Sequence, residues 1–306
     1  MPEVVVAIPT YKRPESLKRL LAALETLETA ADIIVVVADN DGEGRAGYDL
    51  CRSLAPSYRW PLDPVVAEER GIAQVRNCLV ARALSYPGAA FVAMLDDDEW
   101  PSPCWLDELV RVAAQTGADV VEGSILFETA GHAFEPGFDG VSSMRRATGE
   151  TAMLEGAGNI LIARGCLERL TAPWFDPAFA LTGGEDRDFF ERVKACGGRF
   201  AWSDEALAYT AVPALRQTLD WVLRRAYGIG HTEMRIFLKY RPAFALRLRE
   251  YLKIAAALLL MPLLGLALLA RPRKAAGAWR RFFRNMGKLA ALAGRIHQPY
   301  AVTHGD

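Results

Sequence analysis

The sequence has few cysteines, and none of them forms a CxxC pair. There are five, an odd number, spread widely from Cys51 to Cys196. Such a set is typical neither of a disulfide framework nor of a zinc site, so the cysteines are expected to be small core residues in a reducing compartment. The amino-terminal residues also lack a basic start followed by a long apolar run, and no secretory signal is expected.

Acidic residues are nearly absent from the last part of the chain. After Glu250 the only acid is Asp306, against nine Lys and Arg residues, which gives this part a charge of +8 and leaves −9 for residues 1–250. The net charge of −1 for the whole chain hides this division. An acidic body with a basic, apolar end argues against nucleic acid as a partner and favours a membrane surface that carries anionic lipid.

Apolar residues, in contrast, are plentiful, at 51% of 306 residues, so a sizeable core is expected. Short apolar runs predict strands at 4–8, 33–37, 65–67 and 91–95, and leucine spacing and turn residues predict helices between them from Pro14, at 71–83 and at 103–115. This alternation predicts a doubly wound α/β sheet, which binds ligands beyond the carboxyl ends of its strands.

The strand at 91–95 ends abruptly in four acids, Asp96, Asp97, Asp98 and Glu99. Adjacent carboxylates repel one another unless a cation or water screens them. A buried strand that ends in such a cluster therefore indicates a metal-binding edge, and the active site is predicted at this position. The alternative interpretation is a solvated acidic turn that closes a core strand.

Later segments of the chain are expected to add a loop, further strands and further helices. Residues 128–151 are rich in glycine and polar residues and are predicted to be a mobile loop over the site. Strands are expected at 118–126 and 159–163. A short helix is expected at 166–170 and a longer one at 215–241. The stretch GGEDRDFFERVKACGG, residues 183–198, predicts a helix bounded by glycines at both ends.

The basic end of the chain contains residues 254–270, seventeen residues without a charge. As a helix they would reach roughly 25 Å, the short limit for crossing a bilayer. Because Pro262 lies in the middle and basic residues flank both sides, a kinked helix or re-entrant pair in the cytoplasmic leaflet is favoured over a true span or a soluble packing helix. Residues 278–296 predict a basic amphipathic helix at the membrane interface.

Five motifs in order, IPTYKRPESL, VVVADNDG, GIAQVRN, LDDDEWP and GGEDRDFFERVKACGG, resemble the bacterial glycosyltransferase family 2 over about residues 3–212. Within that family they are most similar to exopolysaccharide-type transferases that act on lipid-linked acceptors. The resemblance implies the α/β GT-A fold: a doubly wound mixed sheet with a Rossmann-like nucleotide-binding half and an acceptor half over residues 1–212. A helical, membrane-associating region would follow over residues 213–306.

The resemblance also implies a nucleotide-sugar donor, and it favours a UDP-sugar. Three groups of residues would contact the nucleotide: Pro9, Thr10 and Tyr11 as walls of the nucleoside, Arg13 near the phosphates, and Arg76 of GIAQVRN. Asp39 would accept a hydrogen bond from the pyrimidine N3–H, and Asp41 is the alternative. For both aspartates, ordinary turn chemistry is the competing interpretation.

The acid cluster corresponds to the DxD-type motif of that family. By the resemblance, Asp98 would bind a metal directly, while Asp96 and Asp97 would hold ribose hydroxyls or the waters of the metal, with Asp96 a possible second ligand. Hard oxygen ligands favour Mg²⁺ or Mn²⁺ over zinc. Such a cation would neutralise the charge that accumulates on the departing diphosphate.

The remaining roles implied by the resemblance concern the acceptor. Asp186 is expected to be the base that takes the proton of the attacking hydroxyl, with Glu185 beside it as an orienting group. Acids in the first turn of a helix also simply oppose the helix dipole. Further positions are assigned by similarity: Asn159 to the donor sugar or acceptor, and Arg224 and Arg225 to the diphosphate. His231 is either a further metal ligand or a packed histidine.

These expectations combine into an inverting, metal-dependent glycosyltransferase that extends a lipid-linked or surface-polysaccharide intermediate at the cytoplasmic face of the bacterial inner membrane. A nucleotidyltransferase is the first rival, but the stretch after the first strand has no glycine for a phosphate-binding loop. A non-catalytic sugar-nucleotide binder or membrane scaffold is the second. The QxxRW pattern of processive relatives is absent, which argues against a polymerising synthase.

Overall fold

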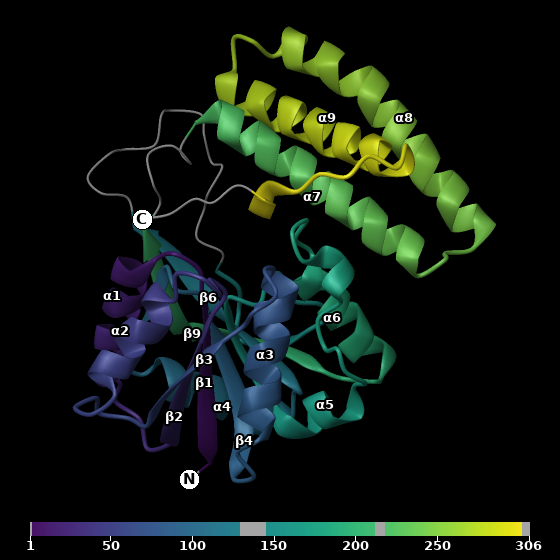
Figure 1. The fold of residues 1–306 in the computed structure, drawn as a ribbon. Coiled ribbons are helices and arrows are strands. Elements are labelled where there is room, and N and C mark those ends of the chain that lie inside the picture. The colour runs from purple at the N-terminus through teal and green to yellow at the C-terminus, as the bar shows by residue number, and fades with distance from the viewer. Residues whose placement is uncertain (1, 129–144, 212–217, 302–306) are drawn as a thin grey trace.

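The computed structural model describes residues 2–128, 145–211 and 218–301 (Figure 1). The strands are β1 (Glu3–Thr10), β2 (Asp32–Asp39), β3 (Leu62–Val66), β4 (Ala89–Leu95), β5 (Glu99–Pro101), β6 (Val120–Glu128), β7 (Gly149–Thr151), β8 (Asn159–Ala163) and β9 (Phe200–Ala211). The helices are α1 (Pro14–Glu25), α2 (Ala46–Leu54), α3 (Ile72–Leu84), α4 (Trp105–Thr116), α5 (Arg164–Arg169), α6 (Glu185–Ala195), α7 (Leu219–Lys239), α8 (Phe244–Ala267) and α9 (Pro272–Leu292), with short 3-10 turns η1 (Pro177–Phe179) and η3 (Pro299–Ala301).

The strands form one mixed sheet in the order β3-β2-β1-β4-β8-β6-β9-β5, with β7 paired to β9. The first four are parallel to one another, as the alternation of strands and helices predicts. β8 then lies antiparallel between β4 and β6, and β6 and β9 are parallel to each other. The sheet therefore consists of a parallel nucleotide-binding-type half joined to a mixed half, which confirms the predicted fold class.

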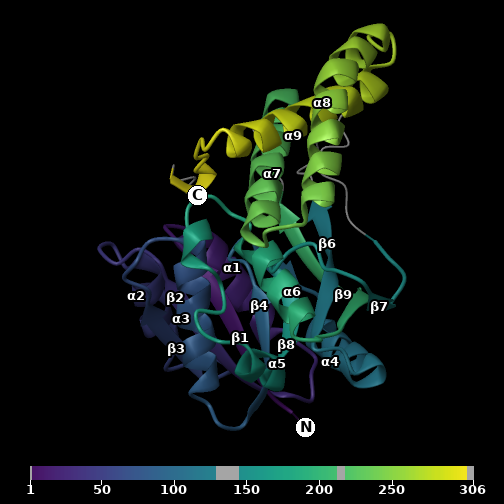
Figure 2. The same ribbon diagram turned by 90° about the vertical axis from the view of Figure 1, so that its right-hand side faces the viewer.

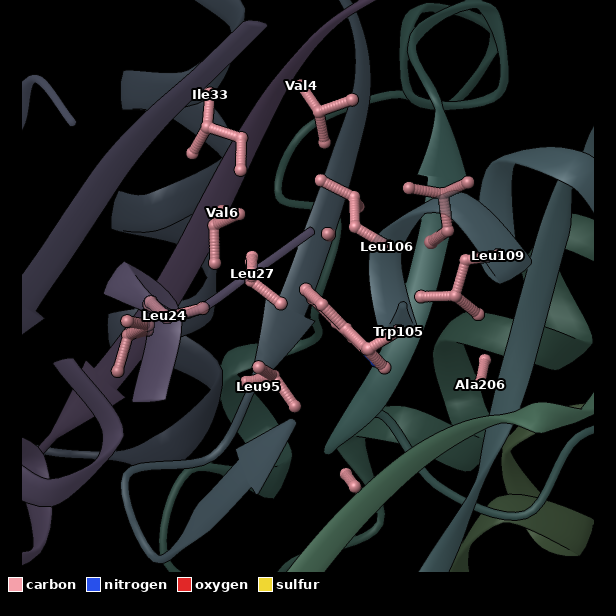
Figure 3. Packing of buried hydrophobic residues seen from close by; sticks show 14 of the residues in the cluster. Val4, Val6, Leu24, Leu27, Ile33, Leu95, Trp105, Leu106, Leu109 and Ala206 are labelled. Atoms are coloured by element: carbon pink, nitrogen blue, oxygen red, sulfur yellow. The ribbon is translucent and has the colours of Figure 1, made fainter. Parts of the chain in front are cut away.

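Helices cover both faces of this sheet because the strands are buried on both sides. In β1, Val4 and Val6 face the cluster that contains α1 and α4, whereas Val5 faces the cluster that contains α3 and α6. Figure 3 shows Val6 near Leu27 of this cluster, and Val4 near Leu106 of α4. The two layers fix the direction of β1, β2 and β4, so that their carboxyl ends meet at one edge.

The leucine spacing of α1 explains why it forms a helix at this place. Leu17, Leu20, Leu21 and Leu24 are all buried, and Pro14 occupies the start of the helix, where its missing N–H costs nothing. The predicted start of this helix is therefore confirmed.

The helix α6 begins where the predicted glycine pair ends. Gly184 has a φ of 94°, which favours glycine, and a Cβ atom there would lie 1.9 Å from Cγ2 of Thr232 on α7. Three acids, including Glu185 and Asp186, occupy the first turn of α6. The close contact brings this acidic helix start directly beside α7.

The three long helices α7, α8 and α9 pack together at one end of the sheet (Figures 1 and 2). Glycines allow α7 and α9 to approach closely, because a Cβ atom on Gly230 would lie 1.8 Å from the carbonyl oxygen of Arg284. The turn between α8 and α9 lies at the end of this unit that is remote from the sheet (Figure 2). The basic end of the chain is thus helical, as expected.

Two details of this region differ from the sequence-based expectation. Of the two forms expected for the apolar segment at 254–270, the structure has a single helix and not a re-entrant pair: residues 254–267 belong to α8, which continues through Pro262 and ends at Ala267. The basic amphipathic helix predicted at 278–296 begins earlier, at Pro272, because that proline suits the first position of a helix. Among the described residues, α8 is the one helix that is long and apolar enough to cross a membrane.

The predicted loop at 128–151 lies mostly outside the described residues. Its last part, Gly149–Thr151, is the short strand β7, which pairs with β9 and is not a loop.

Candidate active site

The four acids after β4 alternate between two environments. Asp97 and Glu99 are buried, whereas the side chains of Asp96 and Asp98 are 36% and 30% exposed. The run forms a tight turn between β4 and β5, in which the N–H of Glu99 donates to the carbonyl oxygen of Asp96 at 3.0 Å. Two acids therefore point into the protein and two stay accessible, which excludes a fully solvated acidic turn.

Asp97 ties the end of β4 to the end of β1. Its Oδ2 accepts a hydrogen bond from Oγ1 of Thr10 at 2.8 Å, and its Oδ1 accepts one from Nη1 of Arg13 at 3.2 Å. The same Nη1 lies 3.0 Å from Oδ2 of Asp98. Burial raises the pKa of Asp97 to about 7, although Arg13 opposes that shift. Asp97 thus links the two strand ends inside the protein, while Arg13 lies beside two acids of the cluster and its contact with the phosphates stays a prediction.

Arg76 brings the acid cluster and the start of α6 together. Its side chain is only 4% exposed, and Nη2 donates to Oδ1 of Asp96 at 2.9 Å while Nε lies 3.4 Å from Oε1 of Glu185. Nη1 donates to the carbonyl oxygen of Ala157 at 2.8 Å. Burial disfavours its charge, but Asp96 and Glu185 outweigh burial and raise the pKa of Arg76. Arg76 therefore contacts protein groups on three segments, and its contact with the nucleotide stays a prediction.

The two acids at the start of α6 share this environment. Burial raises the pKa of Glu185 and of Asp186, and each carboxyl lies close enough to Asp96 to be affected by its charge. Asp186 is half-buried, and its Oδ1 accepts from the backbone N–H of Arg187 at 2.6 Å. A raised pKa moves a carboxylate toward the range in which it is an effective proton acceptor. The residue predicted as a base thus lies beside the acid cluster in space, 88 positions after Asp98 in sequence.

A buried carboxylate holds the loop between these groups. Glu122 of β6 accepts hydrogen bonds from the backbone N–H groups of Glu155 at 2.7 Å and Gly156 at 3.1 Å. Burial raises its pKa to about 8. A Cβ atom on Gly156 would lie 3.8 Å from Oδ2 of Asp186, so the loop that Glu122 anchors forms part of the wall around that residue.

The three residues predicted to wall the nucleoside are not equally available. Pro9 and Thr10 are buried, and the hydroxyl of Thr10 donates to Asp97, so the structure does not support a ligand contact by these two side chains. Tyr11 is half-buried, and its ring lies 5.0 Å from the guanidinium carbon of Arg70. Of the three, Tyr11 alone keeps an accessible side chain.

Asp39 is also used inside the protein. It is 1% exposed, and its Oδ2 accepts from the backbone N–H groups of Gly47 at 2.8 Å and Tyr48 at 3.0 Å, at the start of α2. These bonds agree with the interpretation of Asp39 as a turn residue, and its role in base recognition stays a prediction. Asp41 keeps a 14% exposed side chain near Nζ of Lys12, at 3.9 Å, and its role at the base remains a prediction.

Asn159 is a structural residue, which corrects its assignment to donor or acceptor. It is 1% exposed, its Oδ1 accepts from Nε1 of Trp105 at 2.7 Å, and its Nδ2 donates to the carbonyl oxygens of Ser124 and Ala206, both at 3.1 Å. These bonds use its amide to join β8 with β6, β9 and α4.

The residues of α7 that were predicted to contact a ligand lie in different environments. The side chain of Arg224 is 79% exposed and pairs with Asp220 one turn earlier, so its geometry does not support a diphosphate contact. Arg225 lies over the ring of Trp221, and its role remains a prediction. His231 is buried, with Nε2 2.7 Å from the carbonyl oxygen of Arg295, and is a packed histidine.

A metal would need oxygen atoms from outside the protein. Across residues 2–128, 145–211 and 218–301, no group of three or more His, Cys, Asp or Glu side chains is arranged to hold a metal ion. Asp96 and Asp98 nevertheless present partly exposed carboxylates at one strand end. Because Mg²⁺ is usually bound by one or two carboxylates together with substrate phosphates and water, these two residues fit such a site.

Sequence reasoning missed several residues around the site. Glu99 has no assigned role despite its place in the acid run, although burial and the neighbouring acids raise its pKa well above the usual range. Because Asp97 and Asp98 form a turn, no strand periodicity in the sequence marks Glu99 as buried. Glu122, Arg70 and Tyr300 are single residues outside any motif, and only the folded chain brings them to this edge.

Solved structures share this fold. The structure of S. aureus TarS residues 1–349 in complex with UDP matches with a TM-score of 0.53 at 15% identity, covering 97% of this chain and 93% of that one. The UDP-GlcNAc complex of the same protein matches with a TM-score of 0.52, also at 15% identity, and covers the same shares. The mixed sheet with acids at its carboxyl edge is therefore of the GT-A type.

Sequence comparisons then give the family. The glycosyl transferase family 2 model matches residues 5–153. The chain is 33% identical over 236 residues to succinoglycan biosynthesis protein ExoM of Rhizobium meliloti (strain 1021), which spans 76% of this chain and 74% of that protein. It is 26% identical over 246 residues to chondroitin synthase of Escherichia coli, spanning 68% of this chain and 34% of that enzyme. The protein belongs to glycosyltransferase family 2.

Proposed function

We propose that this glycosyltransferase moves a sugar from a UDP-sugar to a lipid-linked or surface-polysaccharide intermediate, with inversion at the anomeric carbon. One observation carries the proposal: Arg76 gathers Asp96 of the acid cluster and Glu185 of α6 within 3.4 Å of a single buried guanidinium. Donor-side and acceptor-side carboxylates thereby share one edge of the sheet. The names of the relatives, a succinoglycan biosynthesis protein and a structure with bound UDP-GlcNAc, support polysaccharide synthesis from a UDP-sugar.

In the proposed reaction, Asp186 takes the proton of the acceptor hydroxyl while its oxygen attacks the anomeric carbon. The new carbon–oxygen bond forms as the bond from that carbon to the diphosphate breaks, and UDP leaves with the electron pair. Glu185, fixed by Arg76, would orient the acceptor or Asp186. A half-buried carboxyl whose pKa is raised is suited to accept this proton near neutral pH.

The donor would lie along the acids after β4. Arg13 and Tyr11 are the accessible residues on that side, and Asp41 is the candidate for base recognition. A divalent cation, Mg²⁺ or Mn²⁺, held by Asp98 and Asp96 would neutralise the negative charge on the leaving diphosphate. Arg76, as the brace behind Asp96, would keep that carboxylate in place.

The helices α8 and α9 support an acceptor at the membrane surface. Leu252, Leu259, Leu263 and Leu266 recur at helical spacing on α8 and are 56–70% exposed. A shallow groove on α8 has an apolar lining and includes Arg249 and Lys253. An exposed leucine face beside basic residues, with few acids, is suited to the interface of an anionic leaflet. The catalytic edge would then stand at the cytoplasmic face, at the height of the lipid headgroups.

Donor binding can be tested without knowing the acceptor. We expect a UDP-sugar within a panel of nucleotide sugars to raise the melting temperature in the presence of Mn²⁺, since a ligand at about 100 times its Kd stabilises by about 2.7 kcal/mol. Asp98→Ala should lose the part of the shift that depends on Mn²⁺. Asp32→Ala, an exposed aspartate at the opposite end of β2, is the matched control and should keep the shift.

A panel in which no nucleotide sugar stabilises the wild-type protein would contradict the proposed donor. Stabilisation by nucleoside triphosphates alone would instead support a nucleotidyltransferase. Binding with no turnover on any acceptor would favour the non-catalytic scaffold.

A further inference from the structure

The segment after α9 returns to the edge of the sheet that carries the acids. Figure 2 shows this segment, in yellow, leaving the helical unit toward the α/β body. Three contacts hold it: the carbonyl oxygen of Arg295 lies 2.7 Å from Nε2 of His231, the N–H of Tyr300 donates to the carbonyl oxygen of Leu181 at 3.3 Å, and Nη2 of Arg70 donates to the carbonyl oxygen of Tyr300 at 3.0 Å. Residues 295–301 are therefore anchored from three separate parts of the chain.

The side chain of Tyr300 lies beside the start of α6. A Cβ atom on Gly183 would be 3.0 Å from Cε2 of the Tyr300 ring, so the absence of a side chain there lets the ring approach. Burial of its hydroxyl and the charges of Glu185 and Asp186 raise the pKa of the phenol. The ring thus lies next to the carboxyls of the acceptor side.

Tyr300 as a whole is nevertheless 54% exposed. A tyrosine that served only to pack the segment onto the body would be expected to cover more of its ring. Hydrogen bonds to His231, Leu181 and Arg70 already hold the backbone of the segment, so the contacts of the ring are not needed to explain its docking. An exposed aromatic face beside a candidate base is available to a ligand.

The location favours the acceptor over the donor. Arg70, which holds the carbonyl oxygen of Tyr300, lies over the ring of Tyr11 on the predicted nucleoside side. The Tyr300 ring itself lies against Gly183, directly before the first turn of α6. The segment therefore spans from the nucleoside side to the side that carries Asp186.

We infer that Tyr300 is an acceptor-binding residue that determines specificity, and that the apolar face of an acceptor sugar ring packs against its exposed ring beside Asp186. This inference rests on the proposed function, because it needs a sugar acceptor at that carboxylate. Aromatic rings provide large, rigid contact surfaces with a polar hydroxyl at one end, which suits a ligand that is apolar on one face and hydroxylated at its edges.

The test separates acceptor binding from donor binding in the full-length chain. UDP release is measured for the UDP-sugar that stabilises the wild type, with water alone and with a panel of octyl glycosides as acceptor probes. Tyr300→Ala should raise the KM for the octyl glycoside about tenfold, whereas release to water and the Kd for UDP should stay within about twofold. Tyr300→Phe keeps the ring and should keep the acceptor KM near the wild-type value.

Ile296→Ala is the matched control, because Ile296 lies on the same segment and is 73% exposed. It should leave all three quantities unchanged. An unchanged acceptor KM in an active Tyr300→Ala protein would overturn the inference and leave the proposed function intact, as would an equal loss of UDP affinity. A wild-type protein that neither binds nor turns over any UDP-sugar would instead remove the proposed function and the acceptor role with it.

Discussion

Arg76 places a positive charge where it has almost no contact with water. Burying such a charge is costly unless it is paired, and here Asp96 and Glu185 pair with it from different elements. The arrangement is useful mainly because it fixes two carboxylates that would otherwise repel each other. Asp186, next to Glu185, is thereby held at a defined place beside the acid cluster.

The burial of Asp97 predicts how the stability of the protein depends on pH. Its pKa is about 7 in the folded protein against 3.8 for a free side chain, so the folded state binds more protons between these values. Stability therefore falls as pH rises through this window, and burying the charge costs stability above pH 7. Asp97→Asn removes this titration. Relative to the wild type, its free energy of unfolding should therefore rise by about 2 to 3 kcal/mol more at pH 8 than at pH 5. Urea unfolding at both pH values measures it.

Equal changes in stability at the two pH values would show that Asp97 does not titrate in this range, and would contradict the account of its burial.

At the residue scale, the sequence predicted the acid cluster and the pair at the start of α6 because motif spacing reports which strand and helix ends carry charge. It could not predict how each side chain is used. Asp39 and Asn159 match positions of the family, yet both are satisfied by backbone or by Trp105 inside the protein. Such hydrogen bonds join residues 8 to 54 positions apart, and no local pattern reports them.

At the scale of elements, the contact between α7 and α9 depends on missing side chains. A Cβ atom on Gly230 would meet the carbonyl oxygen of Arg284 at 1.8 Å, so the two helices could not stay at their present distance. Gly230→Ala should lower the free energy of unfolding by about 1 to 3 kcal/mol, even though alanine favours helix. Thermal or urea unfolding measures the loss.

Gly277→Ala is the control for helix propensity. Gly277 lies within α9 with nothing inside 4 Å of its Cβ position, so alanine should stabilise the protein by roughly 1 kcal/mol. A similar stabilisation by Gly230→Ala would contradict the close packing of α7 and α9.

Long elements were predictable from hydrophobic periodicity, and the short ones were not. The strands β1, β2 and β4 and the helices α1, α3 and α6 occur where apolar runs and glycine or proline signals place them. The three-residue strands β5 and β7 exist through their pairing with β9, which only the folded sheet supplies. The helix α8 extends back to Phe244 because its first turns, although basic, continue the helical spacing of leucines.

At the scale of the whole molecule, residues 1–250 and the rest of the chain differ in net charge and in exposed apolar surface. Residues 1–250 carry −9 and the remainder +8, and most of the exposed leucines of the described residues lie on α8. We expect the protein to sediment with vesicles that contain anionic phospholipid, and to do so less at high salt, because the basic residues contribute only within a Debye length. Neutral vesicles should bind it more weakly.

Two pairs of substitutions that each add negative charge test which surface binds the vesicles. Leu259→Glu with Leu263→Glu should abolish vesicle binding, since both leucines are more than 60% exposed on α8. Ser53→Glu with Ser57→Glu adds the same charge to exposed positions around the end of α2 and should leave binding nearly unchanged. Equal losses in both pairs would mean that net charge, and not the leucine face, governs binding.

The central claim is that carboxylates from distant segments act together in sugar transfer, and Asp186 tests it most directly. UDP release to an acceptor should fall about 10² to 10⁴-fold in Asp186→Asn, while the Kd for UDP stays near the wild-type value, because a general base acts on the acceptor and not on the nucleotide. Glu191→Gln, on the same helix and paired with Arg187, should retain full turnover. Unchanged turnover in Asp186→Asn would contradict the account.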